Sequence, residues 1–249
     1  MTLLPVDEAL APETRRTADT GFAFVPATHL RAALGGAALA AWPGFAESWD
    51  RLELDTYMAD GGRYRRRRYA TLSAPAQGDA LVLEPEQPHY QSRDYNRLNG
   101  GIARHFAPID TAVLGAATMQ SVLRLGLALF RRLYPQRAAH IEVHQFRIEA
   151  RADALGRPTP EGAHRDGVDF VLVMMVRRVN VGSGTTEIFD FERRRIDSFT
   201  LVEPGDTALV DDRRALHGVT PIVPLDATRA AWRDVLVATY RGIEASAGN

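Results

Sequence analysis

The 249-residue sequence contains no cysteine and no lysine, so all 30 of its basic residues are arginine. Without cysteine, the chain has no disulfide, thiolate metal site, iron–sulfur cluster or cysteine nucleophile. Without lysine, it lacks the Schiff-base residue of aldolases and pyridoxal-phosphate enzymes. It also lacks the phosphate-binding lysine of P-loop proteins and kinases, which excludes most nucleotide-dependent phosphoryl transfer.

The chain also has no excess of charge and no long uninterrupted apolar run. Its basic residues are balanced by 31 acidic ones, and this net charge of −1 does not favour a nucleic-acid partner. The most apolar stretch, residues 112–134, contains Gln120 and three arginines, which does not suit a membrane span. Residues 1–16 lack the basic region followed by an apolar core that marks a secretory signal. We therefore expect a cytoplasmic protein with a small-molecule ligand and no nucleic-acid or membrane partner, and a homodimer is compatible with these properties.

The pattern of the chain predicts one domain over residues 1–249, built from three parts. Residues 1–109 form a mixed N-terminal part, in which an alanine-rich run at residues 30–41 favours a helix. Residues 110–135 are expected to form a supporting helix. Residues 136–249 are expected to form a β-rich core that carries a metal site.

The second and third parts show different periodicities. Leu123, Leu127, Phe130 and Tyr134 recur at helical spacing before Pro135, which predicts a long amphipathic helix packed on a sheet. The β-rich part contains short strand-like runs separated by turn residues, at residues 141–148, 168–179, 186–191, 198–202, 207–210 and 234–240. The predicted fold is therefore α+β, a double-stranded β-helix (jelly roll, cupin-like) core with N-terminal helices packed on one sheet.

A histidine and an aspartate at the start of this β-rich series suggest a metal site. His164 and Asp166 lie two residues apart, so in extended backbone their side chains point to the same face. The chain contains one histidine after Asp166, namely His217, and we take it as the third ligand. Two imidazoles and one carboxylate on one side of a metal are typical of non-haem Fe(II) oxygenases, in which the remaining positions take the co-substrate and dioxygen.

An arginine follows at a position suited to bind the co-substrate. Arg233 lies 16 residues after His217 and opens the last predicted strand, and a guanidinium there is suited to the distal carboxylate of 2-oxoglutarate. Arg229 is the rival for this role. Gln145 and Arg147 alternate with apolar neighbours, so they either face the barrel interior, where they would hold the co-substrate, or face outward, where Arg147 would pair with an acid.

Taken together, these segments resemble the 2-oxoglutarate/Fe(II)-dependent dioxygenases, in particular the bacterial branch of free L-isoleucine hydroxylases. The resemblance covers about residues 90–241. It rests on an ordered set of segments: Tyr95–Arg104, Val143–Ile148, Pro160–Gly167, Glu203–Asp206, His217 and Arg233–Leu236. Many members have Arg-x-Ser at the co-substrate position, whereas here Val235 stands where the serine would be.

The resemblance implies an enzyme that uses Fe(II), 2-oxoglutarate and O₂ to hydroxylate an aliphatic C–H, with release of succinate and CO₂. It implies His164, Asp166 and His217 as the metal ligands. The implied substrate is a small free L-amino acid with a side chain such as that of isoleucine, leucine or methionine. Two groups would recognise it: Glu161 for the ammonium, and Arg104 or Arg165 for the carboxylate.

Other interpretations of the same sequence remain open. The same cofactors support desaturation or cyclisation of an amino-acid-derived metabolite. A non-catalytic β-barrel that binds a metabolite or RNA is the alternative from a different class, since Arg63–Arg68 mixes cationic and aromatic groups, although a solvated or internally paired strand explains that cluster better. His140–His144 superficially suggests a zinc-protease motif, but its glutamate is one place too far from the first histidine.

Overall fold

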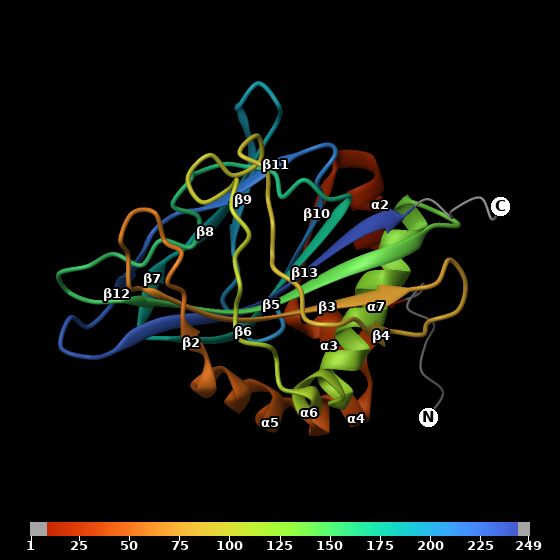
Figure 1. Cartoon of the computed structure of the whole chain (residues 1–249), viewed down its shortest axis with the longest axis horizontal. Helices are drawn as coiled ribbons and strands as arrows, with labels where there is room; N and C mark the ends of the chain where they lie inside the picture. The colour runs from red at the N-terminus through yellow and green to blue at the C-terminus, as the bar shows by residue number, and fades with distance from the viewer. Residues whose placement is uncertain (1–8, 244–249) are drawn as a thin grey trace.

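The structure, a computed structural model, describes residues 9–243 (Figure 1). The first eight residues belong to the segment assessed above for a secretory signal, and they lie outside the described part. Within residues 9–243, no helix combines the length and the hydropathy that a bilayer span requires.

The larger layer is an antiparallel sheet of eight strands, in the order β1-β10-β6-β13-β5-β3-β2, with β4 paired to β3. The long strands β3, β5, β6 and β13 form its centre, and each pairs with its neighbours over most of its length. The strands are β1 (Phe22–Val25), β2 (Glu53–Leu54), β3 (Arg65–Ala74), β4 (Val82–Leu83), β5 (Ala138–Ala150), β6 (Phe170–Val179), β10 (Thr207–Asp211) and β13 (Ala231–Ile243).

A smaller layer faces this sheet. It consists of a three-stranded sheet in the order β11-β8-β9 and a two-stranded sheet, β12-β7. Its strands are β7 (Val181–Ser183), β8 (Thr185–Phe189), β9 (Arg195–Thr200), β11 (Leu216–Val219) and β12 (Ile222–Pro224). In Figure 1 strands β8, β9 and β11 lie above β5 and β13, and helices α4 (Gly36–Ala40), α5 (Trp42–Glu47) and α6 (Thr111–Leu114) lie below them. The two layers agree with the predicted jelly roll, and the helices with an α+β fold.

The helices pack on the outer face of the large sheet, and the main apolar core lies between the helices and this sheet. They are α2 (Ala11–Thr20), α3 (Ala27–Leu34), α4 (Gly36–Ala40), α5 (Trp42–Glu47), the 3₁₀ helix η1 (Ser48–Arg51), α6 (Thr111–Leu114) and α7 (Ala117–Leu133). Helix α7 lies close to β13 because Gly126 has no side chain. A Cβ there would come within 2.2 Å of the Tyr240 hydroxyl, which itself donates a hydrogen bond to the Leu123 carbonyl.

Two predicted helices are broken in the structure. The run at 30–41 is interrupted at Gly35, whose φ of 78° is not helical, and it becomes α3 and α4. The predicted helix at 110–135 begins as the short α6 and restarts as α7, because Ala116 has an extended backbone. Composition predicted a helix in the first segment and periodicity the apolar face of the second, and both missed the breaks.

Candidate active site

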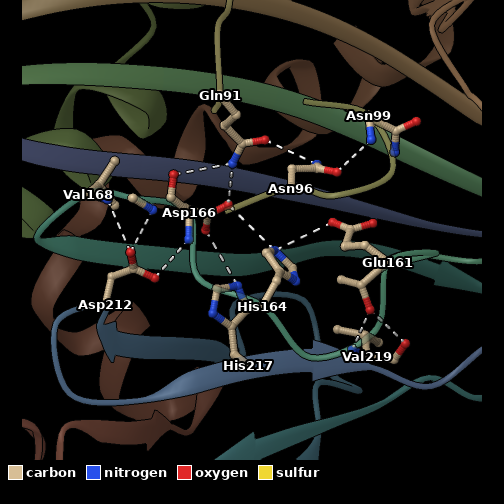
Figure 2. A network of polar contacts seen from close by, with 12 residues as sticks. Gln91, Asn96, Asn99, Glu161, His164, Asp166, Val168, Asp212, His217 and Val219 are labelled. Carbon is tan, nitrogen blue, oxygen red and sulfur yellow. Dashed lines mark hydrogen bonds and ion pairs between the residues drawn. The ribbon is translucent and has the colours of Figure 1, made fainter. Parts of the chain in front are cut away.

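His164, Asp166 and His217 converge at one place between the two sheets (Figure 2). His164 and Asp166 lie in the connection between β5 and β6, and His217 lies on β11. His164 and His217 pair as an isolated antiparallel bridge, in which each N–H donates to the other carbonyl at 3.0 Å. One ligand atom from each of the three side chains lies within 4.8 Å of the other two. The structure thus brings together three side chains that are 53 residues apart at their extremes.

A hydrogen bond at Nδ1 of His164 orients its Nε2 toward Asp166 and His217. His164 Nδ1 donates to the Gly162 carbonyl at 3.0 Å, so Nε2, 3.6 Å from Asp166 Oδ1, is the nitrogen that would bind a metal on losing its proton. His217 Nε2 lies 3.5 Å from Asp166 Oδ2. Two imidazole nitrogens and a carboxylate oxygen are the donor set of a facial Fe(II) site, so the residues present fit the predicted metal.

The charges of the three side chains are interdependent. Burial disfavours the charged form of His164, but the hydrogen bond and charge of Asp166 outweigh it and raise the His164 pKa to about 9. Burial likewise raises the Asp166 pKa, and the hydrogen bond and charge of His164 bring it well below its usual range. His217 has no such hydrogen bond, and burial lowers its pKa to about 4. Asp166 is therefore a carboxylate, the form that binds a cation.

Two further side chains hold the Asp166 segment in place (Figure 2). Asp212, directly after β10, accepts hydrogen bonds from the backbone N–H groups of residues 166, 167 and 168 at 2.8–3.1 Å. Gln91 Nε2 donates to Asp166 Oδ1 at 3.1 Å. Side chains that orient metal ligands contribute to metal affinity, and sequence analysis identified neither of these two.

A second group, His89, Glu142 and His144, also places three donor atoms within 4.8 Å. Arg67 Nη2 lies 2.7 Å from His144 Nδ1. Because arginine only donates, His144 Nδ1 is an acceptor, and in the neutral ring the proton lies on Nε2. Glu142 already accepts hydrogen bonds from Tyr69 at 2.9 Å and from His89 at 3.1 Å. This group is a saturated hydrogen-bond network beside a guanidinium, and His164, Asp166 and His217 form the better cation site.

Both groups line one cavity, whose floor is the inner face of the large sheet. Alternate residues of β13 and β5 point into it: Arg233, Val235, Val237 and Thr239, and Glu142, His144, Phe146 and Ile148. The side chain of Arg233 is 2% exposed, and its Nε and Nη1 atoms have no hydrogen-bond partner among the described residues. A buried guanidinium with free donors needs an anion, which fits the carboxylate of a 2-oxo acid.

Gln145 and Arg147 occupy the intervening positions of β5, and their predicted co-substrate roles are wrong. Both side chains leave the sheet on the face opposite the cavity. Gln145 Nε2 donates to Ser48 Oγ at 2.8 Å, and Arg147 pairs with Asp234 at 2.7 Å and with Asp50 at 2.8 Å. Helix η1 covers this face. Because side chains alternate between the two faces of a strand, the neighbouring residues of β5 point into the cavity.

Two other predicted ligand-binding arginines also lie outside the cavity. Arg229 is exposed in the turn before β13. The guanidinium of Arg165 lies over the rings of Tyr95 and Phe191, at 5.3 Å from each centroid. These contacts pack Arg165 against the loop at residues 90–103 and leave Arg104 as the predicted carboxylate-binding residue that lines the cavity.

In the arginine cluster Arg63–Arg68, residues 65–68 begin β3, and their side chains alternate between its two faces. Arg66 pairs with Glu149 at 2.7 Å on the outer face, whereas Arg65 and Arg67 are buried and line the cavity. Sequence analysis expected a solvated or internally paired strand and missed these two cavity residues. Their spacing of two was the available signal, because positions 65 and 67 share one face of a strand.

Residues 46–239 match the sequence profile of the family described as 2OG-Fe dioxygenase. The chain belongs to this family. The dioxygenase is 26% identical over 193 residues to the L-isoleucine-4-hydroxylase of Bacillus thuringiensis, which covers 76% of this chain and 78% of the relative. It is also 26% identical over 198 residues to the 3(1)-hydroxy-L-isoleucine 4-dioxygenase of Pantoea ananatis (strain AJ13355), which covers 78% of each chain.

Solved structures show the same fold. A bsmA homolog from Methylobium petroleophilum PM1 superimposes with a TM-score of 0.82 at 35% identity, over 93% of this chain and 92% of that chain. The structure of IDO from Bacillus thuringiensis superimposes with a TM-score of 0.79 at 19% identity, over 94% and 100% of the two chains. Family membership confirms the predicted enzyme class of the dioxygenase and its cofactors Fe(II), 2-oxoglutarate and O₂.

Proposed function

We propose that this dioxygenase hydroxylates an aliphatic C–H of a small free L-amino acid. The balanced reaction takes the amino acid, 2-oxoglutarate and O₂ to the hydroxylated amino acid, succinate and CO₂. The names of two relatives, an L-isoleucine-4-hydroxylase and a 3(1)-hydroxy-L-isoleucine 4-dioxygenase, support this substrate class. His164, Asp166 and His217 would hold the Fe(II), and Arg233 would bind the distal carboxylate of 2-oxoglutarate.

The observation that carries the proposal is a pair of buried, opposite charges with free hydrogen-bonding atoms in one cavity. Arg104 is 1% exposed, and its Nε has no partner among the described residues. The side chain of Glu161 is 10% exposed, and its Oε2 likewise has none. A free amino acid carries one anion and one cation, so it satisfies both groups at once.

Arg233 is assigned to 2-oxoglutarate and Asp166 to the metal, and the remaining charged side chains of the cavity have partners. Arg65 binds Asp55 at 2.8 Å, and Glu142 accepts the hydrogen bonds of Tyr69 and His89. Arg67 contacts His144, and its Nε adds a further free donor to the carboxylate side. Besides Arg233, the free groups of the cavity are therefore cationic at Arg104 and Arg67 and anionic at Glu161.

The position of Glu161 supports binding of the amino acid beside the metal. Its Oε1 lies 3.6 Å from His164 Nε2, which is the nitrogen available to the metal (Figure 2). An ammonium held by Glu161 would keep the α-carbon beside the ion. Val168, Val173 and Val237 line the same cavity and offer an apolar surface to an aliphatic side chain.

Bound Fe(II) with 2-oxoglutarate and O₂ supplies the oxidising power to replace a C–H hydrogen by hydroxyl. The residues of the chain would supply binding and orientation. Arg104 and Glu161 fix the two ends of the amino acid, and the valines keep water from the side chain.

The test is incubation of the enzyme with Fe(II), 2-oxoglutarate and a panel of free L-amino acids. We expect succinate release that depends on an aliphatic amino acid, and a product that has gained one oxygen atom by mass spectrometry and NMR. A product that has lost two hydrogens would instead show desaturation or cyclisation. Succinate release that no panel member increases would count against the proposal.

Glu161→Gln tests the ammonium assignment. Loss of a charge-assisted contact is expected to raise the KM for the amino acid about tenfold or more, with 2-oxoglutarate binding unchanged. Glu192→Gln is the matched control, because Glu192 is 72% exposed and binds only Arg194. If an N-acetylated amino acid, which has no ammonium, is converted as well as the free one, the assignment is wrong.

A further inference from the structure

Arg178 and Arg233 lie directly opposite each other on the neighbouring strands β6 and β13. In the same register Asp234 is opposite Arg177, and the bulge between Asp234 and Val235 shifts the pairing only from Val235 onward. Paired residues of neighbouring strands share one face of a sheet. Arg177 binds Asp234 on the outer face at 3.0 Å, so Arg178 and Arg233 both belong to the inner face.

The two guanidinium groups share a space above Gly184. A Cβ placed on Gly184 would lie 3.3 Å from Arg178 Nη1 and 3.8 Å from Arg233 Nη1. Both Nη1 atoms are buried, and neither has a hydrogen-bond partner among the described residues. Ile222 Cγ2 lies 2.7 Å from the same point, so the free donors of both arginines face a narrow space that Gly184 and Ile222 border.

No acid of residues 9–243 forms a salt bridge with either arginine. The hydrogen bond that Arg178 makes is from Nη2 to the carbonyl of Ser183. Like charges directly opposite each other in a sheet destabilise it. Burial and the charge of Arg178 lower the Arg233 pKa to about 10, although the group remains protonated at neutral pH. Two adjacent cations with free donors form a binding site for an anion with at least two oxygen atoms.

We propose that Arg178 is a second binding residue for the distal carboxylate of 2-oxoglutarate, and that it acts together with Arg233. This inference rests on the proposed role of Arg233. Val235, which lines the cavity two residues after Arg233, has no hydroxyl to donate, and Arg178 supplies the further hydrogen bond. The carboxylate accepts hydrogen bonds from Arg233 Nε and Nη1 and from Arg178 Nη1, and it removes the repulsion between the two guanidinium groups.

The test measures ligand binding to the Fe(II)-loaded enzyme without O₂, by calorimetry. In Arg178→Met, the affinity for 2-oxoglutarate is expected to fall 10- to 100-fold. The affinity for 2-oxobutyrate, which lacks the distal carboxylate, is expected to stay within about twofold. Arg229→Met is the matched control, since Arg229 is exposed in the turn before β13 and binds no anion of the cavity.

A thermal melt of the metal-loaded protein gives a second readout. Without 2-oxoglutarate, Arg178→Met is expected to melt at or above the wild-type temperature, because one of two repelling charges is gone. Saturating 2-oxoglutarate is expected to raise its Tm less than that of the wild type. Arg178→Lys keeps the positive charge but loses the planar guanidinium and its several N–H donors. It is expected to bind 2-oxoglutarate several-fold more weakly than the wild type.

Each result decides a different claim. Wild-type affinity for 2-oxoglutarate in both Arg178 variants overturns the role of Arg178. Wild-type affinity in Arg233→Met overturns the assignment of Arg233, and with it the location of the site. A reduction of equal size for 2-oxobutyrate shows that Arg178 supports the fold of the cavity and does not bind the distal carboxylate, which also overturns the proposal.

Discussion

Gln91 donates a hydrogen bond from Nε2 to Oδ1 of Asp166, a proposed metal ligand, at 3.1 Å. Its Oε1 accepts hydrogen bonds from Arg104 Nη2 and from Asn96 Nδ2, both at 3.2 Å. Because Arg104 only donates, the orientation of the Gln91 amide is set. One side chain therefore connects the proposed substrate-carboxylate residue with the metal ligand.

This connection predicts that Gln91→Leu weakens metal binding by about 10- to 100-fold, because the Asp166 carboxylate loses the donor that orients it. Titration of the apoenzyme with Co(II), followed by its visible absorption, measures the affinity. Gln87→Leu is the matched control, since the Gln87 amide donates to Thr71 Oγ1 at 2.8 Å and does not reach the metal ligands. Equal affinities of the two variants would contradict the role of Gln91.

Gly218 permits the close approach of the two histidine segments. A Cβ there would lie 3.3 Å from the backbone N and Cα of Ala163, next to His164. Gly218→Ala is therefore expected to separate His164 from His217 and to weaken Co(II) binding. Gly44→Ala is the control, because a Cβ at Gly44 in α5 meets no atom within 4 Å. Unchanged metal affinity in Gly218→Ala would show that the two segments have room to adjust.

Arg147 is expected to affect stability and not co-substrate binding. Arg147→Met removes one of the two arginine partners of the fully buried Asp234, the other being Arg177. The expected loss in free energy of unfolding is about 2 kcal/mol, measured by urea denaturation. Affinity of the folded variant for 2-oxoglutarate should equal that of the wild type. A large loss of that affinity at unchanged stability would restore the co-substrate role inferred from sequence.

The lowered pKa of buried His144 predicts that the free energy of unfolding falls at mildly acidic pH. Burial, with the charges of Arg67 and His89, lowers the His144 pKa to about 3 against the hydrogen bond of Glu142. Between pH 3 and the ordinary value of 6.5 the unfolded chain binds this proton and the folded chain does not. Stability is therefore complete above about pH 6.5 and falls below it, by up to about 1.4 kcal/mol per pH unit for this group.

Urea denaturation of the apoenzyme at pH 7 and pH 5 measures this contribution. His144→Gln lacks the titrating ring, so the difference in its free energy of unfolding between the two pH values should be smaller than that of the wild type. An equal difference in both proteins would show that His144 is protonated in the folded state.

The sequence alone predicted the group His164, Asp166 and His217, which the structure brings together, and the strand that carries Arg233. The spacing of His164 and Asp166 is covalent, and any extended backbone places both side chains on one face. His217 followed because no other histidine comes after Asp166. Short-range spacing of this kind does not depend on how the sheets pack.

Only the tertiary structure decided which face of each strand meets the cavity. Side chains alternate along β5, and the sequence is compatible with either set of residues facing the cavity. Helix η1 packs on Gln145 and Arg147, so His144 and Phe146 face the cavity. Likewise, Gln91 reaches Asp166 across 75 residues, and Arg178 meets Arg233 through the β6–β13 register. Such contacts depend on which elements bury their apolar faces together, and local periodicity carries no information about that choice.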